Sequence, residues 1–340
     1  MDLMKSVYLK RLIRVVGGAL IVAAVFYLLI PPQPGMPHAL RDTYKDKPLD
    51  VLCVGSSHMM NGLNPIQMFN EKGYAAYDFA NISQAPWQSY FYIKEACKVK
   101  DPRLIIVDVY TMGTRQDVKN KYKDYQTVTN LSGFPLSFNK ISAAFASKAE
   151  SRMDILLRFP YLEIYRPFSG LTREKFTGGK DLSFGYRVFT GVEPYYDAVD
   201  VRDVTDSVPI HEKNEKYLRL IIEYCRENDI DLLLVNTPWC CVTPEAQRYF
   251  NYIGEVAAEY GVPFLNGCNY FEEMGYDCMT DTCGDNGHLN HAGVTKFTTF
   301  VDEYLAEHYD LPDRRDDPFY TELFEQADRW LEEALILSTE

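Results

Sequence analysis

Two short motifs far apart in the chain contain the residue types of a serine-based catalytic triad. Near the start, a Gly-Ser-Ser turn follows an apolar run and places Ser57 before a helical pattern; near the end, Asp285 stands three residues before His288. A serine on a sharp turn between a strand and a helix exposes its hydroxyl beside backbone N–H donors. An aspartate can hold one ring nitrogen of a histidine and leave the other to act as a base. The motifs therefore predict nucleophilic catalysis by Ser57, His288 and Asp285.

Each motif alone is ambiguous, since a Gly-Ser-Ser turn is also an ordinary helix cap. The surrounding elements favour catalysis. Short apolar runs at residues 51–55, 75–79, 104–110, 231–236 and 262–266 alternate with helical patterns at 65–72, 86–100, 211–228, 243–260 and 291–308. This alternation predicts an α/β protein with a doubly wound, flavodoxin-like parallel sheet of about five strands. In such a sheet the loops after the first and the fifth strand open at the same edge, which brings the two motifs together.

Composition and charge limit the function classes. The chain has 340 residues, of which 46% are hydrophobic and 24% charged, and its formal net charge is -13. This composition is that of a globular protein with a substantial core. Binding of nucleic acid needs a basic surface, so an acidic chain excludes nucleic acid as the expected partner.

The first 32 residues differ from the rest. Basic residues at Lys5, Lys10, Arg11 and Arg14 precede an uncharged apolar run that ends at Pro31. The run approaches the length that spans a bilayer, and the basic side of such a segment faces the cytoplasm. Residues 12–32 are thus predicted to anchor the protein in the cell membrane by a single pass, with the catalytic domain extracytoplasmic. A cleaved signal peptide is the alternative.

The rest of the chain divides into four parts. Residues 33–48 are predicted to be a spacer, and residues 49–312 the α/β domain. Within that domain, residues 111–210 are too long for a connecting loop and are predicted to be an insertion over the carboxyl ends of the strands, where such sheets bind ligands. Residues 313–340 form an acidic C-terminal helix, which either packs on the core or binds a partner.

Eight cysteines and six histidines offer no metal motif, since no C-x-x-C pair and no zinc-ligand spacing occurs. No cofactor motif is present either. An exported protein tends to form disulfides, and Cys278 and Cys283 are close enough in sequence to pair with each other.

The two motifs together also carry a family resemblance. The Gly-Ser-Ser turn and the D-x-x-H-L-N-x-x-G run at residues 285–293 resemble the SGNH (GDSL-type) hydrolase superfamily. More closely, runs at 55–65, 77–87 and 233–239 look like those of membrane-anchored SGNH-like proteins of Firmicutes, related to proteins of teichoic-acid D-alanyl transfer and alginate-type O-acetylation. The resemblance spans residues 48–315 apart from the insertion. It implies that Ser57 is the nucleophile, His288 the base and Asp285 the residue that orients it.

The chain departs from the superfamily pattern around the oxyanion hole. Ser56 stands where the first block has aspartate, and Ser83 stands where the second block has a glycine whose N–H binds the oxyanion. The third block lacks its asparagine, and one such donor contributes about 10²–10³ in rate. We expect the hole to be formed by the N–H groups of Ser57 and Ser83, with Asn236 or an N–H of the insertion replacing the missing donor.

Further residues have two interpretations each. Trp87 and Trp239 either stack on a sugar ring or belong to the core. Arg166 either binds an anionic or hydroxyl-rich polymer or pairs with a local acid. Asp108, at a strand end, is either a satisfied buried carboxylate or a residue that reaches the site.

These observations predict an extracytoplasmic acyltransferase or esterase that acts on O-acyl groups, acetyl above all, of cell-surface polysaccharide. The resemblance implies a partner, a membrane-bound O-acyltransferase that exports the acyl group. Two alternatives remain: a carbohydrate or lipid esterase that uses water, and a non-catalytic glycan-binding or assembly protein on the same scaffold.

Overall fold

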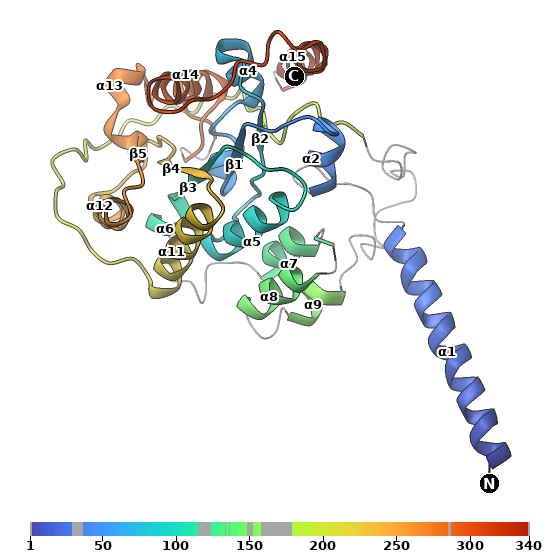
Figure 1. Cartoon of the computed structure of the whole chain (residues 1–340). Coiled ribbons are helices and arrows are strands. Elements are labelled where there is room, and N and C mark those ends of the chain that lie inside the picture. Colours follow the sequence, from blue (N-terminus) through green and yellow to red (C-terminus); the bar gives the residue numbers. More distant parts are fainter. Residues whose placement is uncertain are drawn as a thin grey trace.

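A computed structural model of the protein describes residues 2–28, 37–114, 124–132, 134–135, 137–147, 152–157, 179–284 and 287–338. Its centre is a parallel five-stranded sheet in the order β2-β1-β3-β4-β5 (Figure 1). The strands are β1 (Val51–Val54), β2 (Ala76–Asp78), β3 (Leu104–Asp108), β4 (Asp231–Asn236) and β5 (Phe264–Asn266). This is the flavodoxin-like strand order. The predicted fold class and the five predicted strand positions are confirmed, with some strands shorter than their apolar runs.

Helices cover both faces of the sheet because the strands carry apolar side chains on both. Leu52 and Ile105 face the layer that contains α5 (Pro86–Ala96), α11 (Glu212–Glu227) and α12 (Pro244–Glu259). Val51 and Leu104 face the opposite layer, which contains α4 (Pro65–Lys72) and α14 (His291–His308). All five correspond to predicted helical patterns. Shorter helices are α3 (Ser57–Met60), η3 (Gly267–Asn269) and α13 (Phe271–Met274).

Two terminal segments belong to the packed body. Part of the predicted spacer forms α2 (Pro37–Tyr44), whose Leu40 and Tyr44 are fully buried in the core. The hydroxyl of Tyr44 donates to the carbonyl of Ala76 in β2 at 2.7 Å. At the other end, α15 (Pro318–Leu337) buries Phe324, whose ring stacks on Phe69 of α4 with 3.9 Å between centroids. The acidic tail therefore packs on the core, which was one of the two interpretations of its sequence.

The N-terminal helix α1 (Asp2–Leu28) extends away from the body (Figure 1). Large apolar side chains such as Val15 and Ile21 lie exposed on it. Within the part of the chain that the structure describes, however, no helix combines the length and the apolar character needed to cross a membrane. The structure thus gives no support to the predicted transmembrane segment.

The predicted insertion, residues 111–210, has two parts in the structure. Its first part contains α6 (Tyr110–Thr114), α7 (Asp124–Ser132), α8 (Phe138–Ala146) and α9 (Arg152–Leu157). Here α7, α8 and α9 contact one another and α8 packs against α5, where Asn139 donates to the carbonyl of Phe91 at 3.0 Å. The second part, residues 181–210, has no regular structure and runs around the body toward α12 (Figure 1). We call its segment 186–195 the strap.

Candidate active site

Ser57 and His288 meet at the carboxyl edge of the sheet. The Nε2 atom of His288 lies 2.8 Å from the Oγ atom of Ser57, although the two residues are 231 positions apart. Both side chains are half-buried, so the pair remains open to a ligand. This distance lies within the range of a nucleophile hydrogen-bonded to its general base. Asp285, the third predicted member of the triad, lies outside the described residues.

The turn that presents Ser57 is fixed by local contacts. Ser57 is the first residue of α3, and Ser56 caps this helix by accepting from the N–H of His58 at 3.3 Å. Gly55 allows the close approach of the next strand: a Cβ atom there would lie 2.5 Å from Cβ of Asp108 and 2.8 Å from Cβ of Met59. Only glycine fits at this position, which explains physically why the motif begins with glycine.

Asp108 at the end of β3 contacts this turn directly. Its Oδ2 accepts from the hydroxyl of Ser56 at 2.9 Å, and its Oδ1 accepts from the N–H of Tyr110 at 3.0 Å. Burial raises the pKa of Asp108 to about 6, although the hydrogen bonds from Tyr110 and Ser56 oppose that shift. Of its two interpretations, the structure gives a buried carboxylate whose partners lie next to the nucleophile.

Aromatic rings form one wall of the site. His58 stacks on Tyr110 with 3.3 Å between ring centroids, and it lies 4.6 Å from the ring of His288. Trp239, in the loop after β4, meets Tyr110 edge-on at 5.1 Å. The indole Nε1 of Trp239 is buried without a hydrogen-bond partner among the described residues. The structure thus brings Trp239 to the predicted site, together with His58 and Tyr110.

The other two predicted substrate contacts are not brought to this wall. Trp87 is 4% exposed and packs edge-on against Phe91, with Nζ of Lys213 4.9 Å from its ring. It belongs to the interface of α5 and α11, which is the core interpretation. Arg166 lies outside the described residues.

Two of the predicted oxyanion donors are backbone N–H groups, those of Ser57 and Ser83. Ser83 has a φ of 51°, in the left-handed region that glycine favours, as the superfamily pattern implies. Its loop is tied to the Ser57 turn, because the N–H of Asn81 donates to the carbonyl of Gly55 at 3.2 Å. Among the described residues, neither the N–H of Ser57 nor that of Ser83 donates to another protein group. Both therefore remain candidates for the oxyanion hole.

The side chain of Asn236, one of the two substitutes considered for the missing oxyanion donor, contacts other residues. Its Nδ2 donates to Oδ1 of Asn266 at 2.8 Å and to Sγ of Cys268 at 3.5 Å. An amide nitrogen has only two hydrogens, so none is left for an oxyanion. The side chain faces β5 and its following turn, on the far side of β4 from the nucleophile's strand. The sequence placed Asn236 correctly at a strand end but could not give the direction of its side chain.

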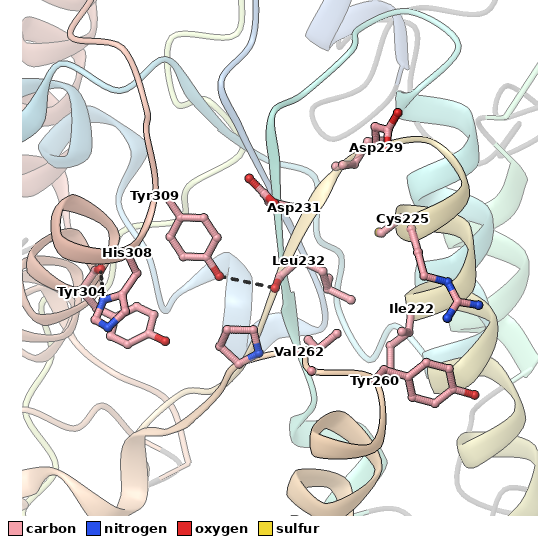
Figure 2. A pocket seen from close by; sticks show the side chains of 14 residues that line it. Ile222, Cys225, Asp229, Asp231, Leu232, Tyr260, Val262, Tyr304, His308 and Tyr309 are labelled. Atoms are coloured by element: carbon pink, nitrogen blue, oxygen red, sulfur yellow. Dashed lines mark hydrogen bonds between the residues drawn. The ribbon is translucent and has the colours of Figure 1, made fainter.

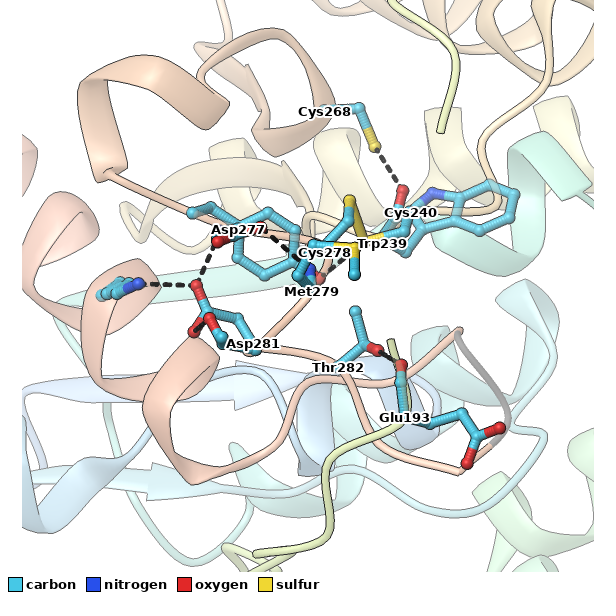
Figure 3. Close-up of a disulfide and its surroundings, with 12 residues drawn as sticks. Glu193, Trp239, Cys240, Cys268, Asp277, Cys278, Met279, Asp281 and Thr282 are labelled. Carbon is cyan, nitrogen blue, oxygen red and sulfur yellow. Dashed lines mark hydrogen bonds and ion pairs between the residues drawn. A yellow bond between two sulfur atoms is a disulfide. The ribbon is translucent and has the colours of Figure 1, made fainter. Parts of the chain in front are cut away.

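A disulfide joins two loops of the site. Cys278, ten residues before His288, is bonded to Cys240, which follows Trp239 directly (Figure 3). The sequence left the pairing of Cys278 open, and its partner is Cys240 rather than Cys283. The bond crosses from the loop after β4 to the loop that carries His288, a proximity that only the folded sheet creates.

The strap holds the same His288 loop from the outside. The N–H of Glu193 donates to the carbonyl of Thr282 at 3.1 Å, and the N–H of Tyr195 donates to the carbonyl of Cys278 at 2.9 Å. The N–H of His291 donates in turn to the carbonyl of Phe189 at 2.6 Å. The insertion thus reaches the site through backbone contacts with the base's loop. No sequence pattern indicated them.

A separate groove lies at the opposite edge of the sheet, where β4 begins. Its volume is about 550 Å³, and Tyr260, Tyr304, His308 and Tyr309 contribute to its lining (Figure 2). The hydroxyl of Tyr309 points at the carbonyl of Leu232 across 3.4 Å. Neither Ser57 nor His288 lines this groove. In the described ranges, no three His, Cys, Asp or Glu side chains gather as a metal site would require.

Comparison with known proteins gives similarity of structure alone. The chain matches no protein-family model and no curated protein. Similar solved structures include a GDSL-like lipase from Bacteroides thetaiotaomicron, at 10% identity and a TM-score of 0.37, covering 76% of this chain and 88% of that one. Another is a lipase/acylhydrolase from Enterococcus faecalis, at 9% identity and a TM-score of 0.37, covering 78% of this chain and 99% of that one. At these identities and TM-scores the similarities say nothing about function.

Proposed function

We propose that the protein is a serine-dependent ester-processing enzyme of the SGNH type, with Ser57 as nucleophile and His288 as general base. The observation that carries the proposal is the 2.8 Å contact between His288 Nε2 and Ser57 Oγ at the ligand-binding edge of the sheet. A histidine that only fills space would not need a half-buried serine hydroxyl at hydrogen-bond distance. Asp285 is proposed to orient His288 on the sequence motif alone.

The reaction follows from these groups. Ser57 Oγ attacks the carbonyl carbon of an ester while its proton moves to His288 Nε2. The negative charge that develops on the carbonyl oxygen is stabilised by the N–H groups of Ser57 and Ser83. Collapse of the intermediate breaks the ester bond, and the leaving alcohol takes the proton from His288. A second hydroxyl, from water or a sugar, then attacks the carbonyl carbon of the acyl–Ser57 ester while its proton moves to His288. The bond between the acyl group and Ser57 Oγ breaks, and His288 returns the proton to Ser57 Oγ.

The proposal also names the molecule that accepts the acyl group from Ser57. We propose transfer of an acyl group, acetyl above all, to a hydroxyl of a cell-surface polysaccharide, because the motifs resemble those of O-acetylation proteins. Tyr110, which is half-buried, would contact a sugar ring, whereas Trp239 is buried next to it. The basic residues before an apolar N-terminal run favour attachment to the membrane with the body outside, beside an acyl-exporting O-acyltransferase. Hydrolysis by water is the second candidate, favoured by the exposure of the Ser57–His288 pair.

A hydrolysis assay with p-nitrophenyl acetate, with and without an oligosaccharide acceptor, tests the proposal. We expect Ser57→Ala to lower p-nitrophenol release by at least about 10³-fold, whereas Ser207→Ala, in the exposed part of the insertion, leaves it unchanged. Release that requires the oligosaccharide indicates a transferase, and equal release without it indicates a hydrolase. Full activity of the folded Ser57→Ala variant would refute both and leave the non-catalytic alternative.

A further inference from the structure

The carboxylate of Asp108 joins the turn that carries Ser57 to the start of α6. One oxygen, Oδ2, faces the nucleophile turn and accepts from both the hydroxyl and the N–H of Ser56, at 2.9 and 3.4 Å. The other, Oδ1, faces the next loop and accepts from the N–H of Tyr110 at 3.0 Å. The hydrogen bonds continue through Ser56, because its Oγ also accepts from the N–H of His58. The residue between Ser56 and His58 is the proposed nucleophile.

Two other buried aspartates, Asp78 and Asp302, differ from Asp108 in these contacts. Asp78 at the end of β2 accepts from the N–H of Ala80 through one oxygen only, and its second oxygen has no partner among the described residues. Asp302 on α14 has no partner for either oxygen there. Burial raises the pKa of both well above the usual range. Asp108 is equally buried, but both of its oxygens accept hydrogen bonds, which favour the charged form.

Through its partners, Asp108 holds both the turn that carries the nucleophile and the aromatic wall. Tyr110, whose N–H it binds, stacks on His58, and His58 lies beside His288. Loss of the carboxylate would therefore release Ser56 on one side and Tyr110 on the other. Catalytic groups need their positions held to within a fraction of an ångström, and a displacement of about 1 Å costs on the order of 10²-fold in rate.

We propose that Asp108 is a positioning residue for the reaction: its carboxylate fixes the Ser56–Ser57 turn and the Tyr110 loop in the arrangement that holds Ser57 Oγ against His288. This inference rests on the proposed function of Ser57. It adds a residue that never touches the substrate and acts through Ser56 and Tyr110.

The test measures the second-order rate of labelling of Ser57 by a fluorophosphonate in the full chain. We expect Asp108→Asn to slow labelling by about 10- to 100-fold, because an amide presents a donor to the N–H or O–H groups on one side. Ser56→Ala, which keeps Asp108 but removes the hydroxyl, should slow it by about 3- to 10-fold, within the range of one lost hydrogen bond. Asp302→Asn is the control, a buried aspartate on α14 outside the site, and should label at the wild-type rate.

A reciprocal exchange separates positioning from general damage. Asp108→Ser alone should label as slowly as Asp108→Asn. Adding Ser56→Asp restores a carboxylate–hydroxyl pair of the same combined length, and we expect labelling to recover to within about 5-fold of wild type, the cost of one imperfect hydrogen bond. Thermal unfolding of each variant shows whether it is folded; if Asp108→Asn does not fold, Ser56→Ala and the exchange decide.

Wild-type labelling rates in folded Asp108→Asn and Ser56→Ala would overturn the inference while leaving the proposed function intact. Failure of the exchange to improve on Asp108→Ser would overturn it as well. Absence of labelling in the wild-type protein is a different result: it would refute the proposed function of Ser57, and the role of Asp108 with it.

Discussion

The turn that carries Ser57 and the loop that carries His288 are held in place in different ways. The turn depends on its own neighbours and on one adjacent strand: Gly55 packs on Asp108, and Ser56 caps α3. The His288 loop depends on distant segments. A disulfide ties it to the loop after β4, and the strap donates backbone hydrogen bonds to it.

The nucleophile is thus positioned by residues close to it in the sequence, and the base by contacts between residues far apart in the sequence. The nucleophile's geometry follows from a few consecutive residues that must fit between two parallel strands. The position of the base follows from contacts that cross 38 residues in the case of the disulfide and 89 in the case of Thr282 with Glu193. Changes to the turn should thus alter chemistry directly, whereas changes around the loop should act through its position and the stability of the fold.

The largest effect is expected from removal of the base itself. His288→Ala should lower ester hydrolysis by at least about 10³-fold, because Ser57 is a weak nucleophile without a proton acceptor. The steady-state rate on p-nitrophenyl acetate measures this. His308→Ala, an exposed histidine at the end of α14, is the control and should retain full activity. Similar losses in both variants would mean that His288 has no special role.

Removal of the disulfide tests whether long-range contacts position the His288 loop. Cys240→Ser combined with Cys278→Ser should lower the free energy of unfolding by about 2–4 kcal/mol, as expected for a bond that closes a loop of this length. Ester hydrolysis should fall by about 10-fold or more, because the His288 loop loses one of its two attachments. Urea unfolding and the hydrolysis rate are the measurements, with Cys97→Ser as control. Loss of stability with unchanged hydrolysis would show that the strap alone positions the base.

The smallest effect is expected at Asp302, which lies in the helix that follows the loop but outside the site. Burial raises the pKa of this carboxyl, so the folded protein retains a proton that the unfolded chain releases. That contribution to stability is present at acid pH and falls as the pH rises above the pKa of the unfolded chain. Asp302→Asn removes the titration, so the variant should become more stable relative to wild type as the pH rises from 5 to 8. Urea unfolding at both values measures this.

Hydrolysis by Asp302→Asn should equal that of wild type at each pH. A change in hydrolysis without a change in stability would contradict the separation between the body and the site.

The same contrast explains what the sequence could predict. The strands and their long helices have strong local signals, such as Asn64 and Pro65 at the start of α4 and Gly73 with a φ of 78° at its end. Two motifs on loops after parallel strands then had to share an edge of the sheet, and the structure places Ser57 and His288 together there. Expectations that depended only on position in a topology were therefore reliable.

Side-chain direction and distant partners could not be predicted. Asn236 stands at the predicted strand end, but its amide turns toward Asn266. The partner of Cys278 was beyond reach because Cys240 comes close only when β4 and the His288 loop are in place. Residues 37–44 lack a long apolar pattern, yet Leu40 and Tyr44 complete the core. Each of these depends on tertiary contacts rather than on local propensity.

The most direct test of the central claim is to identify the residue that a fluorophosphonate modifies. The full chain is treated with the reagent, digested, and the adduct is located by mass spectrometry, with His288→Ala and His308→Ala treated in parallel. We expect an adduct on Ser57 in the wild-type protein and in His308→Ala, and a strongly reduced one in His288→Ala. An adduct on a different serine, or none on the folded wild-type protein, would contradict it.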